Sequence, residues 1–223
     1  MGSINFYNLG SQAAAAKLVA AAVEQASSSG RSVLVLLSGG SAIGTAVRLS
    51  GLIDSVASKC TFSLVDERWG RPGHADSNWQ QLKSADLRLD KINFYEVLNG
   101  QDATAAAGDF NAFLQQALND HDYIIGLFGI GADGHTAGIL PGSPAVAAKG
   151  YAVAYSADDY QRITITPLMI AKIDEAFVYA LGPAKAEQLD RLALELPLDK
   201  QPAQALKTVP KLVIFNDSRG VKL

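Results

Sequence analysis

Short apolar segments rich in β-branched residues alternate along the chain with longer segments in which apolar residues recur every three or four positions. The first pattern is typical of buried strands and the second of helices that pack on a sheet. We expect a first strong strand at residues 32–37, after an Ala-rich helix over about residues 11–26. Further strands are expected at residues 61–65, 93–97, 123–128, 151–155, 163–165, 176–181 and 212–215, and further helices at residues 103–118 and 184–194.

This alternation predicts an α/β fold in which a mostly parallel sheet carries helices on both faces. Residues 1–223 show no internal repeat and no convincing linker, so they are expected to form a single domain. The segment 197–202, which contains two prolines, is predicted to be a surface connection. The tail after Asn216-Asp217 is expected to fray.

Composition narrows the classes of ligand and partner. Hydrophobic residues make up 48% of the chain and charged residues 18%, which is typical of a globular protein. The formal net charge is −3 and no run of like charges forms a basic arm, so nucleic acid is not an expected partner. An anionic ligand would therefore have to be bound by a local group of donors and cations.

The single cysteine, Cys60, excludes an internal disulfide and a cysteine-based metal cluster, and we interpret it as a buried apolar side chain. The N-terminal residues lack the features of a signal peptide, and no apolar segment is long enough to span a bilayer. We therefore expect a cytoplasmic protein with no membrane partner. The sequence does not determine the oligomeric state, and a monomer is the default expectation.

In an open α/β sheet, ligands bind at the carboxyl ends of the strands, which directs attention to the loops there. The loop after the first strong strand reads Ser38-Gly39-Gly40-Ser41 and precedes a helix expected to begin near Ala42. Its glycines, hydroxyls and free N–H groups suit a phosphate, although a tight turn with a serine cap explains the same residues.

The next such loop begins with Asp66-Glu67-Arg68-Trp69 and continues through His74 to Asp76-Ser77-Asn78. Adjacent charges after an apolar strand must be solvated, paired or directed at a polar ligand. A solvated loop is one interpretation. The other is that Arg68 binds oxygen atoms of a ligand, since its guanidinium suits carboxylates, phosphates and oxyanions. His74 is interpreted as a loop residue.

The third loop follows the strand at residues 123–128 and has the glycine spacing G-x-G-x-x-G from Gly129 to Gly134. A dinucleotide site would need a long helix at this point, but Gly138 and Pro141 interrupt any helix within two turns. A nicotinamide or flavin site therefore stays only as an alternative, which the later acidic pair Asp158-Asp159 would support.

His135 lies two residues after Asp133 on this glycine-rich loop, where a general base would have the necessary exposure. A structural histidine is the competing interpretation, and His121 is expected to be solvent-exposed in a turn. Arg162 and Lys185 would each place a cation near the same edge of the sheet. No spacing of histidine, cysteine and carboxylate residues suggests a metal site.

Taken in order, these segments resemble the 6-phosphogluconolactonase family. The most specific match is Asp133-Gly134-His135-Thr136-Ala137 with Leu140-Pro141-Gly142, followed by Asp66-Glu67-Arg68-Trp69 with Asp76-Ser77-Asn78, and by Arg162-Ile163-Thr164-Ile165-Thr166. The sequence departs from the family pattern at Ala42-Ile43, at Gly138-Ile139 and at residues 158–161, where a proline-rich segment is common.

The resemblance implies a modified doubly wound, Rossmann-like fold, related to that of glucosamine-6-phosphate deaminases, and an enzyme that needs neither metal nor organic cofactor. It implies a small sugar-phosphate lactone as substrate. His135 would be the catalytic base, with Asp133 and Arg68 beside it. The implied substrate and phosphate contacts are Ser38, Gly39, Gly40, Ser41, Asp66, Asn78, Gly131, Arg162 and Lys185.

Lactone hydrolysis requires a deprotonated water, donors for the developing oxyanion and a proton for the departing ring oxygen, and one imidazole can perform both proton transfers. Asp133 would orient the His135 ring, while Arg68 and the loop N–H groups would bind the oxyanion. Two alternatives remain: a glucosamine-6-phosphate deaminase or sugar-phosphate isomerase, and a module that binds sugar phosphates without turnover. Residues 136–140 contain no carboxylate, which disfavours the deaminase.

Overall fold

The computed structural model describes residues 3–88 and 90–222. Its main sheet has eight strands, and every pairing among them is parallel. In spatial order the strands are β11 (Val221–Lys222), β1 (Ser3–Asn8), β10 (Lys211–Asn216), β9 (Glu175–Tyr179), β6 (Tyr123–Gly129), β2 (Val33–Leu37), β3 (Cys60–Leu64) and β5 (Asn93–Phe94).

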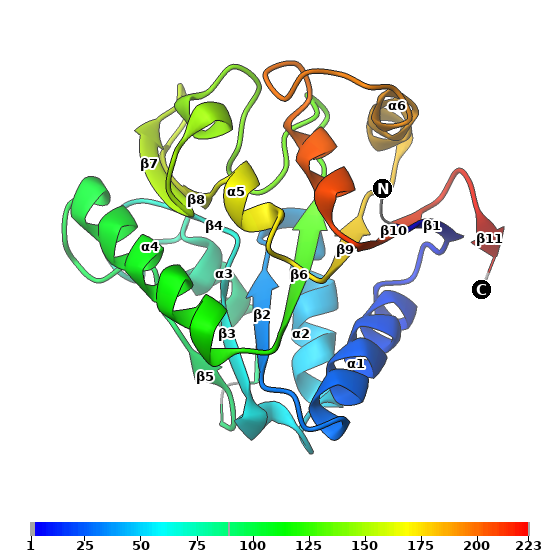
Figure 1. Ribbon diagram of the computed structural model, residues 1–223, viewed down its shortest axis with the longest axis horizontal. Helices are drawn as coiled ribbons and strands as arrows, with labels where there is room; N and C mark the ends of the chain where they lie inside the picture. Colours follow the sequence, from blue (N-terminus) through cyan, green and yellow to red (C-terminus); the bar gives the residue numbers. More distant parts are fainter. Residues whose placement is uncertain (1–2, 89, 223) are drawn as a thin grey trace.

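A second, three-stranded antiparallel sheet contains β4 (Asp66–Arg68), β8 (Gln161–Ile165) and β7 (Ala152–Ser156). Val65 links the two sheets, because its N–H donates to Leu37 O at 2.9 Å and its carbonyl accepts from Ile165 N at 2.9 Å. The small sheet therefore lies at the end toward which the β2 and β6 arrows point (Figure 1).

The helices are α1 (Gln12–Ser28), α2 (Ile43–Leu52), α3 (Asn78–Ser84), α4 (Ala103–Asp120), α5 (Pro167–Ile170) and α6 (Pro183–Leu192), with short 3-10 helices at Gly40–Ala42, Ala57–Lys59, Pro144–Ala147 and Pro202–Thr208. The two longest begin at capping side chains: Ser11 accepts from Ala14 N, and Asp102 accepts from Thr104 N and Ala105 N. Such caps satisfy N–H groups that have no partner within the helix.

Helices cover both faces of the main sheet. α1 contacts α2, and α2 contacts α3, as the chain moves from β2 through β3 toward β5. The chain then returns through α4 to β6 and continues in the opposite direction to β9 and β10, and right-handed crossovers place α4 on the other face. Figure 1 shows α1 and α2 on one side of β2 and β6 and α4 on the other. The predicted doubly wound α/β fold is confirmed.

The strand order reverses between β2 and β6, which are neighbours in the sheet. From β2 the chain proceeds toward β5, whereas from β6 it proceeds toward β10. The loops that leave the two carboxyl ends therefore diverge and open a crevice between them, as at the switch points of other doubly wound sheets.

The core lies between the sheet and the helices on each face. All five residues of β2 are buried, and so are the central five of β6. The alanines of α1 allow its backbone to approach the sheet closely, since Ala15 and Ala16 are fully buried. The largest fully buried side chains include Phe62, Phe110, Phe128 and Phe215, each of which contributes about 1.5–3 kcal/mol by leaving water.

The strands predicted at residues 151–155 and 163–165 are present as β7 and β8, but they lie in the small antiparallel sheet. β1, β4 and β11 were not predicted, and two expectations about individual segments were wrong. The segment 197–202 is not wholly a surface connection, because Gln201 and Pro202 are buried. The tail after Asp217 does not simply fray, since β11 pairs with β1.

Candidate active site

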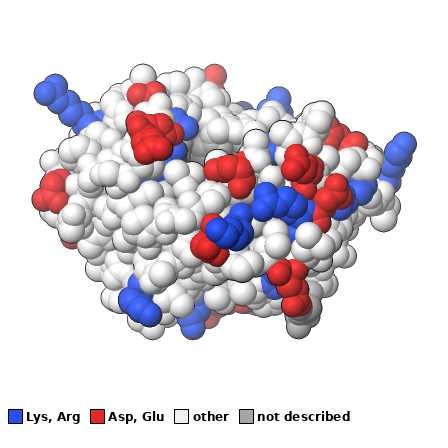
Figure 2. All heavy atoms as spheres, turned by 90° about the horizontal axis from the view of Figure 1, so that it is seen from above, with Lys and Arg blue, Asp and Glu red and all other residues white. Residues whose placement is uncertain are grey.

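The crevice at the switch point contains a cavity of about 250 Å³. It is bounded by the loops after β2 and β6, by the start of α3, by β4 and β8 of the small sheet, and by α6. Figure 2 looks down on this end of the molecule, where basic and acidic side chains gather close together. The lining residues are Ser38, Gly39, Gly40, Ser41, Asp66, Arg68, Asn78, Gly129, Ile130, Gly131, His135, Ala137, Arg162 and Lys185.

The loop after β2 brings its backbone close to the cavity because two positions require glycine. Gly40 has a φ of +58°, which favours glycine. A Cβ on Gly39 would lie 2.2 Å from Asn78 Oδ1, so only a hydrogen atom fits there. The loop then turns into the 3-10 helix Gly40–Ala42 and α2. Free N–H groups and hydroxyls at such a turn can bind anionic oxygen atoms.

Glu67 fixes the position of two cavity residues from below. Its side chain is fully buried, and Oε1 accepts from Arg68 N at 2.7 Å and from Asn78 N at 2.6 Å. Oε2 accepts from Ser77 Oγ at 2.8 Å and from Trp79 N at 3.1 Å. Burial raises the pKa of Glu67, while these donors act against that rise. The solvated-loop interpretation of Asp66-Glu67-Arg68 is wrong for Glu67.

Asp66 is also buried, with only 6% of its surface exposed. Burial raises the pKa of its carboxyl group, and the nearby charges of Arg162, His135 and Arg68 offset part of that rise. The main-chain carbonyl of Asp66 accepts from Asn78 Nδ2 at 2.9 Å, which holds the Asn78 amide at the cavity wall. One carboxyl group therefore lies among three basic side chains.

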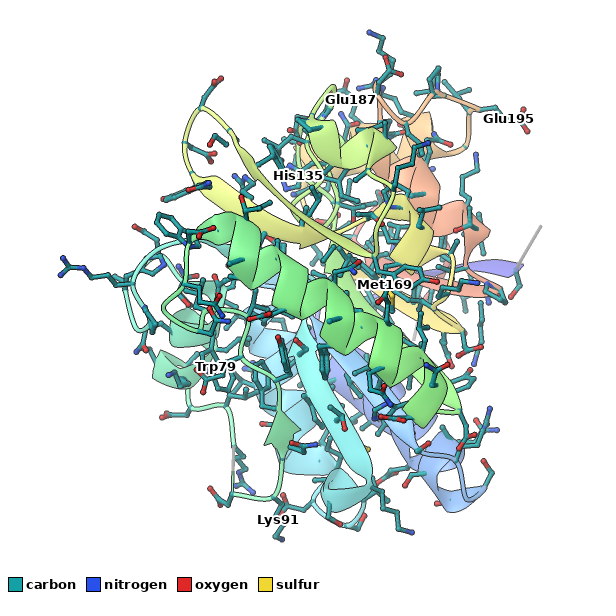
Figure 3. All side chains as sticks on the ribbon, turned by 60° about the vertical axis from the view of Figure 1, so that its left-hand side comes forward. Trp79, Lys91, His135, Met169, Glu187 and Glu195 are labelled. Carbon is teal, nitrogen blue, oxygen red and sulfur yellow. The ribbon has the colours of Figure 1, made fainter. Side chains whose placement is uncertain are left out.

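His135 and Asp133 form a bonded pair at the mouth of the cavity. His135 Nδ1 lies 2.6 Å from Asp133 Oδ1, and the same oxygen accepts from His135 N at 3.1 Å. The His135 side chain is 36% exposed, and Figure 3 shows it at the upper end of the molecule, far from Lys91. Because a carboxylate can only accept, Nδ1 carries the proton and Nε2 of the neutral ring is free to take another.

The electrostatics of this pair favour a charged Asp133. Partial burial acts to raise the pKa of Asp133, but the hydrogen bonds and charge of His135 outweigh it and lower that pKa to about 2. The carboxylate is therefore ionised at neutral pH. A fixed negative charge at this distance stabilises an imidazolium ring, which is the form that a general base reaches after taking a proton.

The loop that carries His135 is held in a strained shape. Gly134 has a φ of +88° and Ala137, a non-glycine residue, has a φ of +49°. Thr136 Oγ1 donates to Gly129 O at 2.9 Å, and Gly138 N donates to Thr164 Oγ1 at 3.0 Å, which anchors the loop to both sheets. No helix begins between Gly129 and Pro144, so the loop does not support the dinucleotide alternative.

Lys185 reaches the cavity from α6, the helix after β9. Its Nζ donates to Ile130 O on the His135 loop. Burial lowers the pKa of Lys185, and the charge of Asp133 acts against that decrease. The ammonium group therefore lies between the loop after β6 and the beginning of α6, where an anionic ligand would also meet the helix N-terminus.

The structure brings together nearly all the residues that the sequence suggested. Every residue suggested for catalysis or binding lines the cavity except Asp133, which reaches it through His135. Three further residues line the cavity without having been assigned a role from the sequence: Gly129, Ile130 and Ala137. The pair Asp158-Asp159 was linked to the dinucleotide alternative, whereas Asp159 Oδ2 accepts from Arg162 Nη2 at 2.7 Å.

The other two histidines lie elsewhere. His74 Nε2 is 3.0 Å from Arg68 O, in keeping with a loop residue. His121 is half-buried at the end of α4, where Nδ1 lies 2.9 Å from Ala117 O, so the prediction that it is solvent-exposed is wrong. Within residues 3–88 and 90–222, no three histidine, cysteine or carboxylate side chains are grouped as metal ligands. In the same described part, no helix has the length and apolar character needed to cross a membrane.

Comparison with known proteins places these features in context. The sequence model of the family described as glucosamine-6-phosphate isomerases/6-phosphogluconolactonase matches residues 10–214. The 6-phosphogluconolactonase 3, chloroplastic, of Arabidopsis thaliana is 29% identical over 204 residues, which cover 82% of this chain and 62% of that protein. The 6-phosphogluconolactonase of Pseudomonas putida is 29% identical over 161 residues, 66% of this chain and 64% of that protein. The chain thus spans less than two thirds of the length of these relatives.

Among solved structures, the 6-phosphogluconolactonase from Thermotoga maritima superposes with a TM-score of 0.80 and 18% identity. The superposition covers 97% of this chain and 99% of the other. At this level of identity the likeness concerns the fold, and it extends over both the main sheet and the small antiparallel sheet.

Proposed function

Because the chain belongs to the family of glucosamine-6-phosphate isomerases and 6-phosphogluconolactonases, we propose that it hydrolyses 6-phospho-D-glucono-1,5-lactone to 6-phosphogluconate, a reaction of the oxidative pentose phosphate pathway. The observation that carries the proposal is the His135–Asp133 pair, 2.6 Å between Nδ1 and Oδ1, at the mouth of a cavity lined by Arg68, Arg162 and Lys185. The curated relatives compared above carry the same activity in their names.

The proton transfers follow from this pair. Nε2 of His135 takes a proton from a water molecule as the water oxygen attacks the lactone carbonyl carbon. Asp133 stabilises the resulting imidazolium and holds the ring in one orientation. When the tetrahedral intermediate collapses, the bond from that carbon to the ring oxygen breaks, and the imidazolium returns its proton to this oxygen. The histidine is thereby restored, and the product is a carboxylic acid, which releases its remaining proton to water at neutral pH and becomes a carboxylate.

The remaining cavity residues bind charge. The carbonyl oxygen becomes negative in the intermediate, and Arg68 with the N–H groups of the glycine loops would stabilise it. Arg162, Lys185 and the loop Ser38–Ser41 would bind the phosphate, since they add two cations and free N–H donors at the same cavity. All these roles use proton transfer and fixed charge, so we propose that the reaction needs no metal or organic cofactor. We also propose that residues 1–223 act as one domain.

The test is a pH-stat assay with freshly prepared 6-phosphogluconolactone. We expect His135→Ala to lower kcat by about 10²–10⁴-fold, the usual contribution of a general base. His121→Ala is the matched control, because His121 lies at the end of α4 and does not line the cavity. Equal kcat values for wild type and His135→Ala would remove His135 from the mechanism.

The same assay separates binding from chemistry. Arg162→Ala and Lys185→Ala should raise KM more than they lower kcat, because they remove contacts made before the reaction as well as during it. Unchanged kinetics in both variants would refute the phosphate assignment. Ammonia release from glucosamine 6-phosphate would indicate the deaminase instead. Thermal stabilisation by 6-phosphogluconate without any lactone hydrolysis would indicate a sensor.

A further inference from the structure

Two arginines of the cavity face each other across the small antiparallel sheet. In the β4·β8 pairing, Arg68 is directly opposite Arg162. Side chains of directly opposed residues lie close together on one face of a sheet, and like charges in that position repel. Two guanidinium groups so placed need a further interaction to hold them together.

Partners within the protein satisfy these groups only in part. Arg162 Nη2 donates to Asp159 Oδ2 at 2.7 Å, and Arg68 Nη1 donates to the carbonyl of Asp76 at 3.1 Å. The Nε atoms of Arg68 and Arg162 are buried and have no hydrogen-bond partner among the described residues. Arg162 as a whole is only 9% exposed. Unsatisfied buried donors next to a cavity indicate a ligand that accepts hydrogen bonds.

The Tyr160 ring supplies a further attraction for both arginines, in addition to the Asp66 carboxyl group near them. Arg68 Cζ lies 4.8 Å from the ring centroid, and Arg162 Cζ lies 5.8 Å from it. Both distances are within the range of cation–π attraction. The ring carries no charge, so it attracts both guanidinium groups without adding another negative charge to that of Asp159, which already pairs with Arg162.

We propose that Tyr160 is a positioning residue, whose ring keeps Arg68 and Arg162 together as one receptor for the anionic oxygen atoms of a phosphorylated sugar. The proposal rests on the function proposed above and adds a residue to it.

The experiment measures equilibrium binding of two stable probes, 6-phosphogluconate and inorganic phosphate, by isothermal titration calorimetry. Tyr160→Leu keeps an apolar side chain but removes the ring. We expect it to lower the affinity for each probe by about tenfold, the effect of losing cation–π contacts at a partly buried site. The affinities for the two probes should fall by the same factor, because the ring contacts the arginines and not the sugar.

Two further variants distinguish positioning from general damage. Tyr160→Phe keeps the ring and loses only the hydroxyl, which lies 3.5 Å from Asp76 Oδ1, so binding should return to within about twofold of wild type. Tyr123→Leu is the matched control: its ring also lies against a guanidinium, with Arg31 Cζ 4.3 Å from the centroid, but it is at the opposite end of β6. It should leave both affinities unchanged.

Wild-type affinity in Tyr160→Leu would overturn the proposal, and so would a Tyr160→Phe variant as weak as Tyr160→Leu. Melting curves show whether each variant is folded, and Tyr160→Met replaces the leucine variant if that one unfolds. The outcome is independent of turnover, because neither probe is hydrolysed. If wild type fails to open the lactone, the proposed reaction is wrong, while the dependence of anion binding on the ring is still decided.

Discussion

At the scale of single residues, the His135–Asp133 pair depends on a glycine that leaves room for it. A Cβ on Gly131 would lie 2.1 Å from His135 Nδ1 and 2.4 Å from Asp133 Oδ1. Both contacts are far shorter than atoms tolerate, and they involve the two atoms that are hydrogen-bonded to each other. Gly131 therefore determines the geometry of two neighbouring side chains without contributing one of its own.

We expect Gly131→Ala to lower kcat by roughly 10²-fold, because a displaced general base loses most of its effect. The kinetics of lactone hydrolysis measure this directly. Gly108→Ala is the control, since Gly108 lies inside α4 with no atom within 4 Å of a Cβ. That change should leave kcat unaltered and stabilise the fold by up to about 1 kcal/mol. An active Gly131→Ala enzyme would show that the pair need not keep this geometry.

The charge of Asp133 predicts how stability depends on pH. Its pKa in the folded protein, about 2, is lower than that of a free aspartate. The ionised side chain therefore contributes to the free energy of unfolding above about pH 4. That contribution is lost as the pH falls through 2. Asp133→Asn has no such group, so the difference in unfolding free energy between wild type and variant should shrink across this window. Urea unfolding at several pH values measures the difference, which is small because the side chain is half-exposed.

Some residue roles were readable in the sequence and others were not. Asp133 and His135 belong to one short motif, and their contact follows from a separation of two residues along a tight loop. The partnership of Arg68 with Arg162 depends on the register of two strands that are almost a hundred residues apart in the chain. No local pattern encodes that register, so the role of Tyr160 beside both arginines became visible only in the structure.

At the scale of elements, three buried glutamines join α6 to the loop that carries His135. Gln188 Nε2 donates to Ala132 O at 2.9 Å, Gln201 Nε2 donates to Gln188 O at 2.8 Å, and Gln204 Nε2 donates to Gln201 Oε1 at 2.6 Å. All three side chains are buried. Since Lys185 is on the same helix, the network connects the helix that carries Lys185 to the loop that carries His135.

Replacing Gln188 by leucine removes the donor to Ala132 O and the Oε1 acceptor of Arg191 Nη1, while the Gln201 amide keeps its bond to the main-chain carbonyl of Gln188. Hydrogen bonds of this kind contribute about 0.5–1.5 kcal/mol each, and each kcal/mol corresponds to a decrease in Tm of roughly 2–4 °C for a chain of this size. Thermal denaturation measures the decrease. Glu187→Gln, an exposed neighbour on α6, should leave Tm unchanged. Equal Tm values for Gln188→Leu and wild type would show that the network adds no stability.

The elements that were missed share a physical cause. β4 consists of Asp66-Glu67-Arg68, whose composition is typical of a loop, and it becomes a strand only because β8 pairs with it. Gln201 and Pro202 are polar or turn-forming residues, yet Gln201 is buried because Gln188 and Gln204 satisfy its amide. In both cases, partners distant in the chain override the local preference.

At the scale of the whole molecule, one hydrophobic cluster includes buried residues from Leu9 to Phe215 and extends over both faces of the main sheet. α4 contributes Phe110, whose side chain lies in this core and is fully buried. The apolar periodicity of the sequence predicted this arrangement well, because burial of one helix face is encoded locally. The antiparallel sheet depends on pairing at long range and was not predicted.

Phe110→Ala should therefore lower the free energy of unfolding by about 3–5 kcal/mol, the usual cost of emptying an aromatic position in a core. Urea unfolding measures it. Phe113→Ala is the comparison, because Phe113 is only partly buried and stacks on Tyr95 with ring centroids 3.9 Å apart. The second change should cost less. Equal decreases in the free energy of unfolding would mean that the stacking of Phe113 on Tyr95 contributes as much stability as the burial of Phe110.

The position of β1 has a consequence for how the protein is made. β1 holds the first described residues, yet its partners in the sheet are β10 and β11, which are the last strands in the chain. During translation the ribosome releases this strand long before its neighbours exist. β1 must therefore stay unpaired, with a partly apolar edge open to aggregation, until residues 211–216 have also been synthesised.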